Sequence, residues 1–200
     1  MSRTTSPPHV PGTIRRSSGP WDLNMIAMHG PITAAEQLFV AEHMVTGRAG
    51  RTTVEVGCGT GRFAHWLHHA HGYHVTGLDL PPHNLRLARL RGQGTGLLYA
   101  AHDAETGPPA GLPVDGVDLV VARMTTRYLC DPERLLRQVR DRWPRPGGCL
   151  YLQVLAKPFP DELQGWMAPE NLPAYVDGWA SRQRMDEGPR AHLVLRTSPR

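Results

Sequence analysis

The strongest chemical signal in the sequence is a glycine-rich loop followed, one predicted strand later, by a carboxylate. Gly57, Gly59 and Gly61 occupy alternate positions directly after a β-branched run. Because glycine lacks a Cβ, this spacing allows a tight turn whose backbone a ligand can approach closely before the next helix begins. Asp79 ends the next predicted strand, where a carboxylate can accept hydrogen bonds from both hydroxyls of a ribose. The pattern therefore predicts a site for an adenosine-containing ligand.

The glycine spacing indicates which ligand this is. Nicotinamide-dependent oxidoreductases use G-x-G-x-x-G, whereas this chain has G-x-G-x-G with Glu55 in the preceding strand. The segment VEVGCGTGRF resembles the first motif of class I S-adenosylmethionine-dependent methyltransferases. The resemblance implies that S-adenosylmethionine is the cofactor and that Glu55 binds its amino group. It also implies that the loop backbone holds the cofactor, through Gly57, Cys58, Gly59 and Gly61.

Later motifs extend the resemblance from about residue 53 to residue 152. GLDLPPHNLRLAR is similar to the second motif of the family, which implies that Asp79 binds the ribose and Leu80 packs against the adenine. HDAE resembles the third, which implies that the Asp103 carboxylate and the Ala104 amide recognise the adenine edge. Structural alternatives stay open: Glu55 could pair with a core arginine or a loop amide, Asp79 could cap a helix, and Asp103 could simply lie in a loop.

The residues after the fourth predicted strand depart from the family pattern. Many small-molecule members have histidines there, whereas this chain has Arg127 and Tyr128. An arginine can hold an anionic acceptor, and a tyrosine can orient a nucleophile by a hydrogen bond. Arg123, which ends the strand, is a further predicted cofactor contact. Before the first helix, Trp21 is predicted to cover the sulfonium and His29 is the nearest candidate base.

These motifs favour methyl transfer to a small molecule. Amino-methylating enzymes that flip bases have an Asn- or Asp-Pro-Pro-aromatic box, which is missing after the fourth predicted strand. The sequence also has no serine nucleophile elbow. Lys157 is the only lysine, a composition resembling that of GC-rich actinomycete genomes, which suggests a natural-product or metabolic intermediate as acceptor. The alternative is a non-catalytic S-adenosylmethionine-binding regulator or partner subunit of the same fold.

Strand and helix patterns alternate along the chain and position these motifs. β-Branched or apolar runs predict strands, and apolar residues at helical spacing predict helices. The pattern indicates a Rossmann-like three-layer α/β sandwich with a mainly parallel seven-stranded sheet whose last strand is antiparallel. The predicted strands are 51–57, 74–80, 97–101, 116–124 and 149–156, followed by a hairpin of 179–186 and 191–198; the predicted helices are 32–45, 61–70, 83–91 and 132–143.

The same patterns suggest how the 200 residues are organised. Residues 1–20 are rich in Ser, Thr, Pro and Gly and are expected to be a disordered tail. Residues 21–200 are expected to form one domain, with an N-terminal lid and helix at 21–50, a cofactor-binding core at 51–156, and a substrate rim with closing strands at 157–200. One or two short helices are expected in the proline-interrupted rim.

Composition narrows the functional classes further. The net charge of +4 comes from arginines scattered among acidic residues, which does not indicate nucleic-acid binding. Apolar runs are too short for a membrane span or a signal peptide, so a cytoplasmic protein is expected. We expect it to be a monomer or a homodimer. His65, His68 and His69 share helical spacing, but no Asp, Glu or Cys accompanies them, so we expect no metal site.

Overall fold

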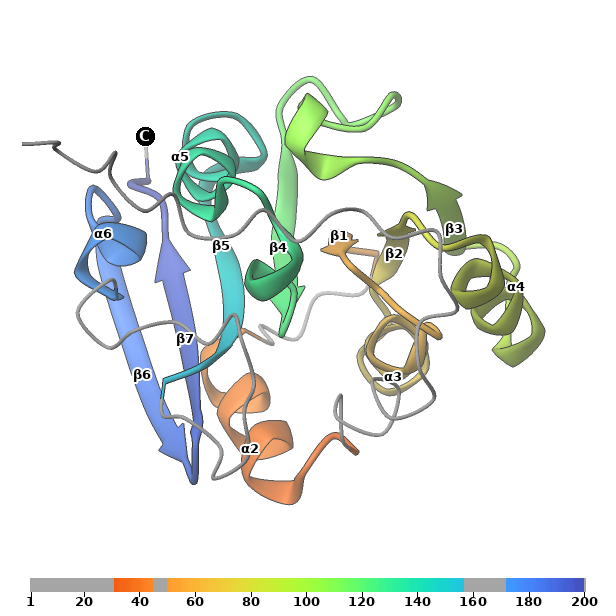
Figure 1. Cartoon of the computed structure of the whole chain (residues 1–200), viewed down its shortest axis with the longest axis horizontal. Coiled ribbons are helices and arrows are strands. Elements are labelled where there is room, and N and C mark those ends of the chain that lie inside the picture. The colour runs from red at the N-terminus through yellow and green to blue at the C-terminus, as the bar shows by residue number, and fades with distance from the viewer. Residues whose placement is uncertain (1–30, 45–49, 157–171, 200) are drawn as a thin grey trace, which may run out of the picture.

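A seven-stranded sheet forms the centre of the computed structural model, which describes residues 31–44, 50–156 and 172–199. The strand order is β3-β2-β1-β4-β5-β7-β6; β1 to β5 are parallel, and β7 runs antiparallel to both β5 and β6 (Figure 1). The strands are β1 (Thr52–Val56), β2 (His74–Asp79), β3 (Leu97–Ala101), β4 (Val117–Arg123), β5 (Pro144–Leu155), β6 (Ser181–Glu187) and β7 (Arg190–Arg196).

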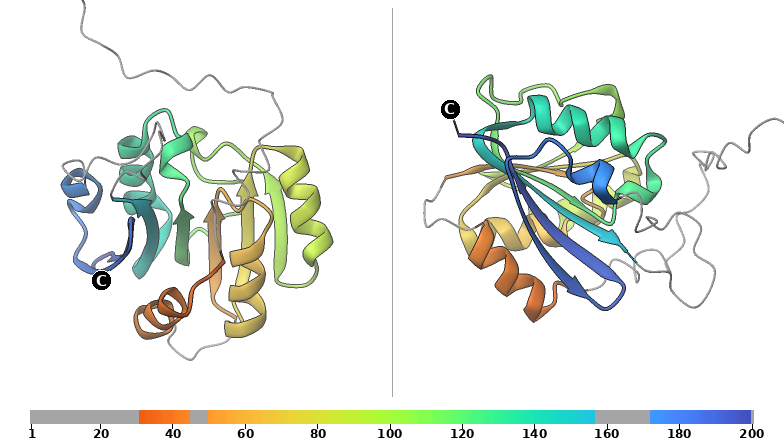
Figure 2. Two further views of the ribbon diagram at one scale, coloured as in Figure 1. Left: turned by 60° about the horizontal axis from the view of Figure 1, so that its bottom comes forward. Right: turned by 90° about the vertical axis from the view of Figure 1, so that its left-hand side faces the viewer.

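Helices cover both faces of this sheet and make a three-layer structure. On one face lie α2 (Ala34–His43), α3 (Arg62–His71) and α4 (Pro82–Arg91). On the other lie α5 (Pro132–Arg142) and α6 (Leu172–Val176), as Figure 2 shows in its right-hand view. Each layer has its own apolar core, so each sheet face is buried along its central strands. The predicted fold class is confirmed.

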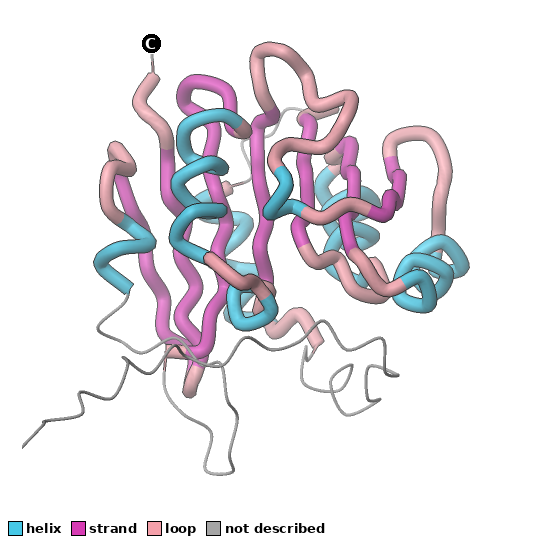
Figure 3. The backbone as a smooth tube through the Cα atoms, turned by 45° about the horizontal axis from the view of Figure 1, so that its top comes forward, coloured by secondary structure: helices cyan, strands magenta, loops and turns pink. Residues whose placement is uncertain are grey.

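Alternation of strand and helix places most connections at the two ends of the sheet. Figure 3 shows this arrangement, with the long loop that joins β3 to β4. Two short 3-10 helices, η1 (Ala104–Thr106) and η2 (Thr126–Tyr128), follow β3 and β4. The carboxyl ends of the parallel strands β1 to β4 thus share one edge with the segments that carry the predicted site.

Two predicted details differ in the structure. The fifth strand begins at Pro144 rather than Cys149, because Pro144 pairs with Val117 before a register shift leads to the pair of Leu119 and Cys149. The proline therefore ends α5 and starts the strand at once. Within the described residues of the predicted rim, one short helix, α6, is present.

The capping box predicted at the first helix forms only in part. Thr33 caps α2, since its hydroxyl accepts a hydrogen bond from the Glu36 N–H at 3.0 Å. The Glu36 carboxylate does not return to the helix start, because it binds Arg123 and Tyr151 instead. By contrast, Asp131 caps α5 as predicted, with its carboxylate 2.9 Å from the Arg134 N–H.

Several predicted segments lie outside the described residues. These are the tail at 1–20, the lid region at 21–30 with Trp21 and His29, and residues 157–171 of the rim. The proposed division into tail, lid, core and rim therefore remains a prediction. No helix among the described residues is both long enough and apolar enough to cross a membrane.

Candidate active site

The glycine loop between β1 and α3 has the backbone conformation that its sequence predicts. Gly57, Gly59 and Gly61 have φ values of 68°, 54° and 72°, which L-residues with a side chain rarely adopt. A Cβ on Gly57 would lie 2.4 Å from the hydroxyl oxygen of Thr125, so the loop packs directly on the turn after β4. A Cβ on Gly59 would meet no atom within 4 Å. The Gly59 position thus borders open space where a ligand can lie on the backbone.

Asp79 holds this loop in place from the end of β2. Its Oδ2 accepts a hydrogen bond from the Gly59 N–H at 2.6 Å, and its Oδ1 accepts one from the Leu80 N–H at 2.7 Å. The proposal that Asp79 caps the following helix is wrong, because Pro81 is the N-cap of α4 and no side chain caps it. Burial raises the pKa of Asp79, and the two N–H donors oppose that shift. The side-chain amide of Asn84 also donates to Oδ2, at 3.5 Å. A carboxylate has about four acceptor sites, so one remains for a ribose hydroxyl while Asn84 is bound.

Glu55 lies beneath the same loop in β1. Its side chain is 2% exposed, and within the described residues its Oε2 has no hydrogen-bond partner. Burial raises the pKa of Glu55 to about 8, while the nearby positive charge of Arg123 and a backbone hydrogen bond from Ala64 act in the opposite direction. The site therefore contains a buried carboxyl group with one oxygen still available to a hydrogen-bond donor.

Arg123 is engaged by a partner that the sequence did not reveal. Its Nε and Nη2 donate to the two oxygens of Glu36 at 2.7 and 2.8 Å, and its guanidinium lies 4.8 Å from the centre of the Phe63 ring. The ion pair is buried, with side-chain exposures of 9% for Arg123 and 1% for Glu36. One structural alternative for Glu55 was a pair with a core arginine. That pair does not form, because both hydrogen bonds of Arg123 go to Glu36. The prediction that Arg123 itself contacts the cofactor remains a prediction.

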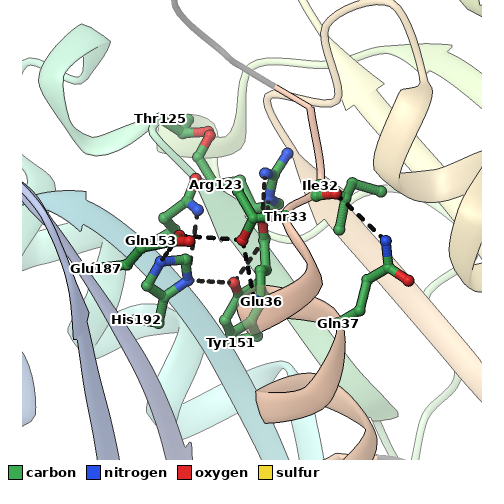
Figure 4. Close-up of polar contacts among 10 residues, drawn as sticks. All are labelled: Ile32, Thr33, Glu36, Gln37, Arg123, Thr125, Tyr151, Gln153, Glu187 and His192. Carbon is green, nitrogen blue, oxygen red and sulfur yellow. Dashed lines mark hydrogen bonds and ion pairs between the residues drawn. The ribbon is translucent and has the colours of Figure 1, made fainter.

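The Glu36 carboxylate belongs to a larger polar group between α2 and the sheet (Figure 4). The Tyr151 hydroxyl donates to Glu36 Oε1 at 2.7 Å and lies 2.8 Å from Nδ1 of His192. On its other side, His192 lies 3.3 Å from a carboxylate oxygen of Glu187, which also accepts from the Thr33 hydroxyl. These side chains come from α2, β5, β6 and β7, so the group fastens the first described helix to the far half of the sheet.

The predicted adenine side is assembled from the ends of β2 and β3. The His102 N–H donates to the Asp79 carbonyl at 3.2 Å, which brings the two strand ends together. Leu80 is 47% exposed there, whereas Ala104 is buried at the start of η1. Asp103 caps η1, its Oδ1 accepting from the Glu105 N–H at 3.1 Å. The contact of Leu80, Asp103 and Ala104 with adenine remains a prediction.

Glu105 is a further residue that sequence inspection missed. Its carboxylate accepts hydrogen bonds from the N–H groups of Cys130 and Asp131 at 3.1 and 2.8 Å. These contacts tie the segment after β3 to the segment after β4. Glu105 thereby fixes the spacing between the predicted adenine side and the predicted acceptor side.

The predicted acceptor residues lie in η2, next to the loop. The Arg127 guanidinium stands 5.2 Å from the centre of the Tyr128 ring. Burial raises the pKa of Tyr128, the charge of Arg127 lowers it, and the charge of Asp79 adds to the rise. The structure thus brings Arg127 and Tyr128 to the same edge as Asp79. Trp21 and His29 lie outside the described residues.

The histidines of α3 lie outside the candidate site, although their spacing raises the question of a metal site. Among the described residues no three His, Cys, Asp or Glu side chains are placed to hold a metal ion together. The rings of His65 and His69 lie 4.1 Å apart, and the pKa of His65 is lowered, chiefly by partial burial and then by His69 and Arg91.

Known proteins resemble this chain in sequence and in fold. Residues 54–152 match the family model described as a methyltransferase domain. The ubiquinone biosynthesis O-methyltransferase of Methylobacterium sp. (strain 4-46) is 30% identical over 140 residues, which are 69% of this chain and 53% of that protein. The same enzyme from Sodalis glossinidius is 29% identical over 109 residues, 54% of this chain and 43% of that protein. The chain thus spans about half the length of the curated relatives it matches.

A solved S-adenosylmethionine-dependent methyltransferase from Mesorhizobium loti superposes with a TM-score of 0.63. It is 22% identical, and the match covers 82% of this chain and 98% of that one, a likeness that concerns the fold. The sheet order, the G-x-G-x-G loop pinned by Asp79 and the family match agree with one another. The chain belongs to the class I S-adenosylmethionine-dependent methyltransferases, and S-adenosylmethionine is the cofactor of that family.

Proposed function

We propose that this protein transfers the methyl group of S-adenosylmethionine to a hydroxyl oxygen of a small molecule. The observation that carries the proposal is the pairing of Asp79, pinned beneath Gly59, with the buried and partly unsatisfied Glu55. Together they suit a ligand that has both ribose hydroxyls and a positive charge. Support for oxygen as the acceptor comes from the relatives, which are named O-methyltransferases.

The cofactor, when bound, supplies the activated methyl group. On this proposal Asp79 binds the ribose, Glu55 accepts a hydrogen bond from the amino group, and the Gly59 backbone forms the floor. Holding the acceptor at attack distance and excluding water are the remaining tasks of the protein. On this proposal Arg127 and Tyr128 in η2 perform these tasks.

An acceptor hydroxyl must lose its proton to become a good nucleophile. Arg127 stays charged at neutral pH, so on this proposal it stabilises the anionic form of a phenol or enol, while Tyr128 orients the acceptor oxygen. His29 remains the proposed base. The proposed setting is cytoplasmic, as a monomer or homodimer acting on a natural-product or metabolic intermediate, for which the composition of the sequence is the support.

Turnover with labelled cofactor tests this function. The protein is incubated with methyl-labelled S-adenosylmethionine and matched small molecules that differ only in the acceptor: phenol, amine or thiol. Label should appear in the phenols, and replacing Arg127 with Gln should reduce turnover while leaving cofactor affinity within about twofold. Label in amines or thiols alone would contradict the choice of acceptor. Cofactor binding without any transfer, also in an extract of the producing organism, would favour the non-catalytic regulator.

A further inference from the structure

Three ionisable groups lie buried together beside the glycine loop: Glu36, Glu55 and Arg123. Their side chains come from α2, β1 and β4. Glu36 and Glu55 are 1% and 2% exposed. Two carboxyl groups and one guanidinium therefore lie in a region from which water is largely excluded, where an unpaired charge is costly.

The position of Arg123 in the sheet makes either carboxylate a possible partner. Glu55 is in register with Val121, and Arg123 follows Val121 by two residues, so Glu55 and Arg123 point to the same face of neighbouring strands. Such diagonal neighbours are within reach of a long side chain. The structure nevertheless gives both guanidinium hydrogen bonds to Glu36 and leaves Glu55 Oε2 without a partner.

Neighbouring side chains hold Arg123 on the Glu36 side. The bidentate geometry fixes the guanidinium plane, and the Phe63 ring packs against it at 4.8 Å. The Tyr151 hydroxyl supplies a third hydrogen bond to the Glu36 carboxylate. The position of the positive charge is therefore determined by α2, a helix that contributes no motif residue.

We propose that Glu36 is a specificity-determining residue, which keeps the guanidinium of Arg123 from pairing with Glu55, so that an unpaired carboxylate under the glycine loop favours cationic S-adenosylmethionine over net-neutral S-adenosylhomocysteine. This inference rests on the proposed function. S-Adenosylmethionine has a positive sulfonium in addition to its amino and carboxylate groups, so its net charge is positive. S-Adenosylhomocysteine keeps the amino and carboxylate groups but lacks the sulfonium. A negative site thus distinguishes cofactor from product and eases product release.

Charge rescue distinguishes this role from a purely structural one. In Glu36→Gln, Arg123 loses its anionic partner and becomes free to neutralise Glu55. In Glu36→Gln with Arg123→Gln, the freed positive charge is removed as well, and Glu55 is again the uncompensated carboxyl. Tyr151→Phe is the matched control, because it deletes one hydrogen bond to the same carboxylate but keeps the ion pair.

The measurement is calorimetric titration of each variant with S-adenosylmethionine and with S-adenosylhomocysteine, at a pH above 8 so that Glu55 is ionised. The quantity of interest is the ratio of the two dissociation constants. Two unit charges about 10 Å apart at an effective dielectric constant of about 20 change an equilibrium constant roughly tenfold. We expect Glu36→Gln to reduce the preference for S-adenosylmethionine by about that factor, and we expect the double variant and Tyr151→Phe to keep it within about twofold.

Each outcome decides the matter. An unchanged ratio in Glu36→Gln, or a ratio that stays low in the double variant, would show that Glu36 only anchors α2 and would overturn the inference. Should Glu36→Gln fail to fold, the double variant still tests it, since a lost preference there contradicts the charge argument. If the parent protein binds neither ligand, the proposed function itself fails, which is a distinct result.

Discussion

At the scale of single residues, the glycines of the loop differ in what a side chain would meet. Gly57 faces Thr125, whose hydroxyl lies 2.9 Å from the Val56 carbonyl oxygen, whereas Gly59 faces open space. Both have positive φ, so any substitution costs about 1 kcal/mol in backbone strain. The difference between the two positions therefore separates a packing role from a ligand-contact role.

Gly57→Ala should lower the free energy of unfolding by more than Gly59→Ala does, because the new methyl group has no room beside Thr125. The extra cost of such overpacking is about 1–3 kcal/mol. Gly59→Ala should fold with little more than the backbone cost but lose cofactor binding. Urea denaturation and calorimetric titration measure the two effects. Equal destabilisation with full cofactor affinity in Gly59→Ala would contradict the placement of the ligand on this loop.

Glu55 should make cofactor affinity depend on pH. Burial raises its pKa to about 8, with Asp79 and Glu36 adding to the rise and Arg123 opposing it. A cationic ligand binds the deprotonated form better, so affinity for S-adenosylmethionine should increase as pH rises from 6 to about 8, by at most about tenfold per unit, and then level off.

Glu55→Gln provides the control for that pH profile, because it keeps the shape and removes the titration. The difference between the two profiles isolates Glu55 from the ionisation of the ligand itself. A raised pKa also means that the folded state binds the proton more tightly than the unfolded chain. The unliganded parent should therefore lose unfolding free energy as pH rises from about 5 to about 8, and Glu55→Gln should lose less. If the parent and Glu55→Gln showed parallel pH profiles, the raised pKa assigned to Glu55 would be contradicted.

At the scale of elements, the Asp118 carboxylate joins the amino ends of three strands, which lie opposite the end that carries the site. Asp118 of β4 is 8% exposed, and its Oδ2 accepts from the Thr52 N–H of β1 at 2.8 Å. It also forms ion pairs with Arg51, which precedes β1, and with Arg145 of β5. Asp118 thereby connects three neighbouring strands that together position the glycine loop and the turn after β4.

Asp118→Ala should lower the free energy of unfolding by about 1–3 kcal/mol, because it leaves a partly buried N–H without an acceptor and two arginines without their shared partner. Asp115→Ala, at an exposed position of the preceding loop, is the matched control and should change stability by less than about 0.5 kcal/mol. Denaturant titration compares the two. A loss no larger than that of the control would show that the strand ends do not depend on Asp118.

At the scale of the whole molecule, two apolar cores on opposite faces of the sheet support a site that lies at the strand ends between them. A ligand bound there contacts segments from both halves of the sheet, so its binding should stabilise the whole fold. A ligand that binds only the folded state raises the free energy of unfolding by about 2.7 kcal/mol at a concentration of 100 times Kd.

S-Adenosylmethionine and S-adenosylhomocysteine should each raise Tm by roughly 5–10 °C at that concentration, since about 1 kcal/mol corresponds to 2–4 °C for a chain of this size. NAD and NADP should leave Tm unchanged, because the loop has G-x-G-x-G spacing. Thermal scans with each ligand make the comparison. An equal shift with NAD would contradict the assignment of the cofactor, whatever the substrate.

Local sequence determined the order of strands and helices, most of their limits and the sharp turn at Gly57, Gly59 and Gly61, because turn geometry, capping and strand alternation are properties of short segments. Asp131 capping α5 is an example. Only the tertiary structure decided which partner Arg123 takes, since Glu36 lies 87 residues away and Tyr151 lies 115 residues from Glu36. Nothing in a local pattern distinguishes a glutamate that closes a capping box from one that crosses to a buried arginine. That choice depends on how α2 packs against the sheet. The same packing decides whether the carboxyl group of Glu55 has Arg123 as a partner.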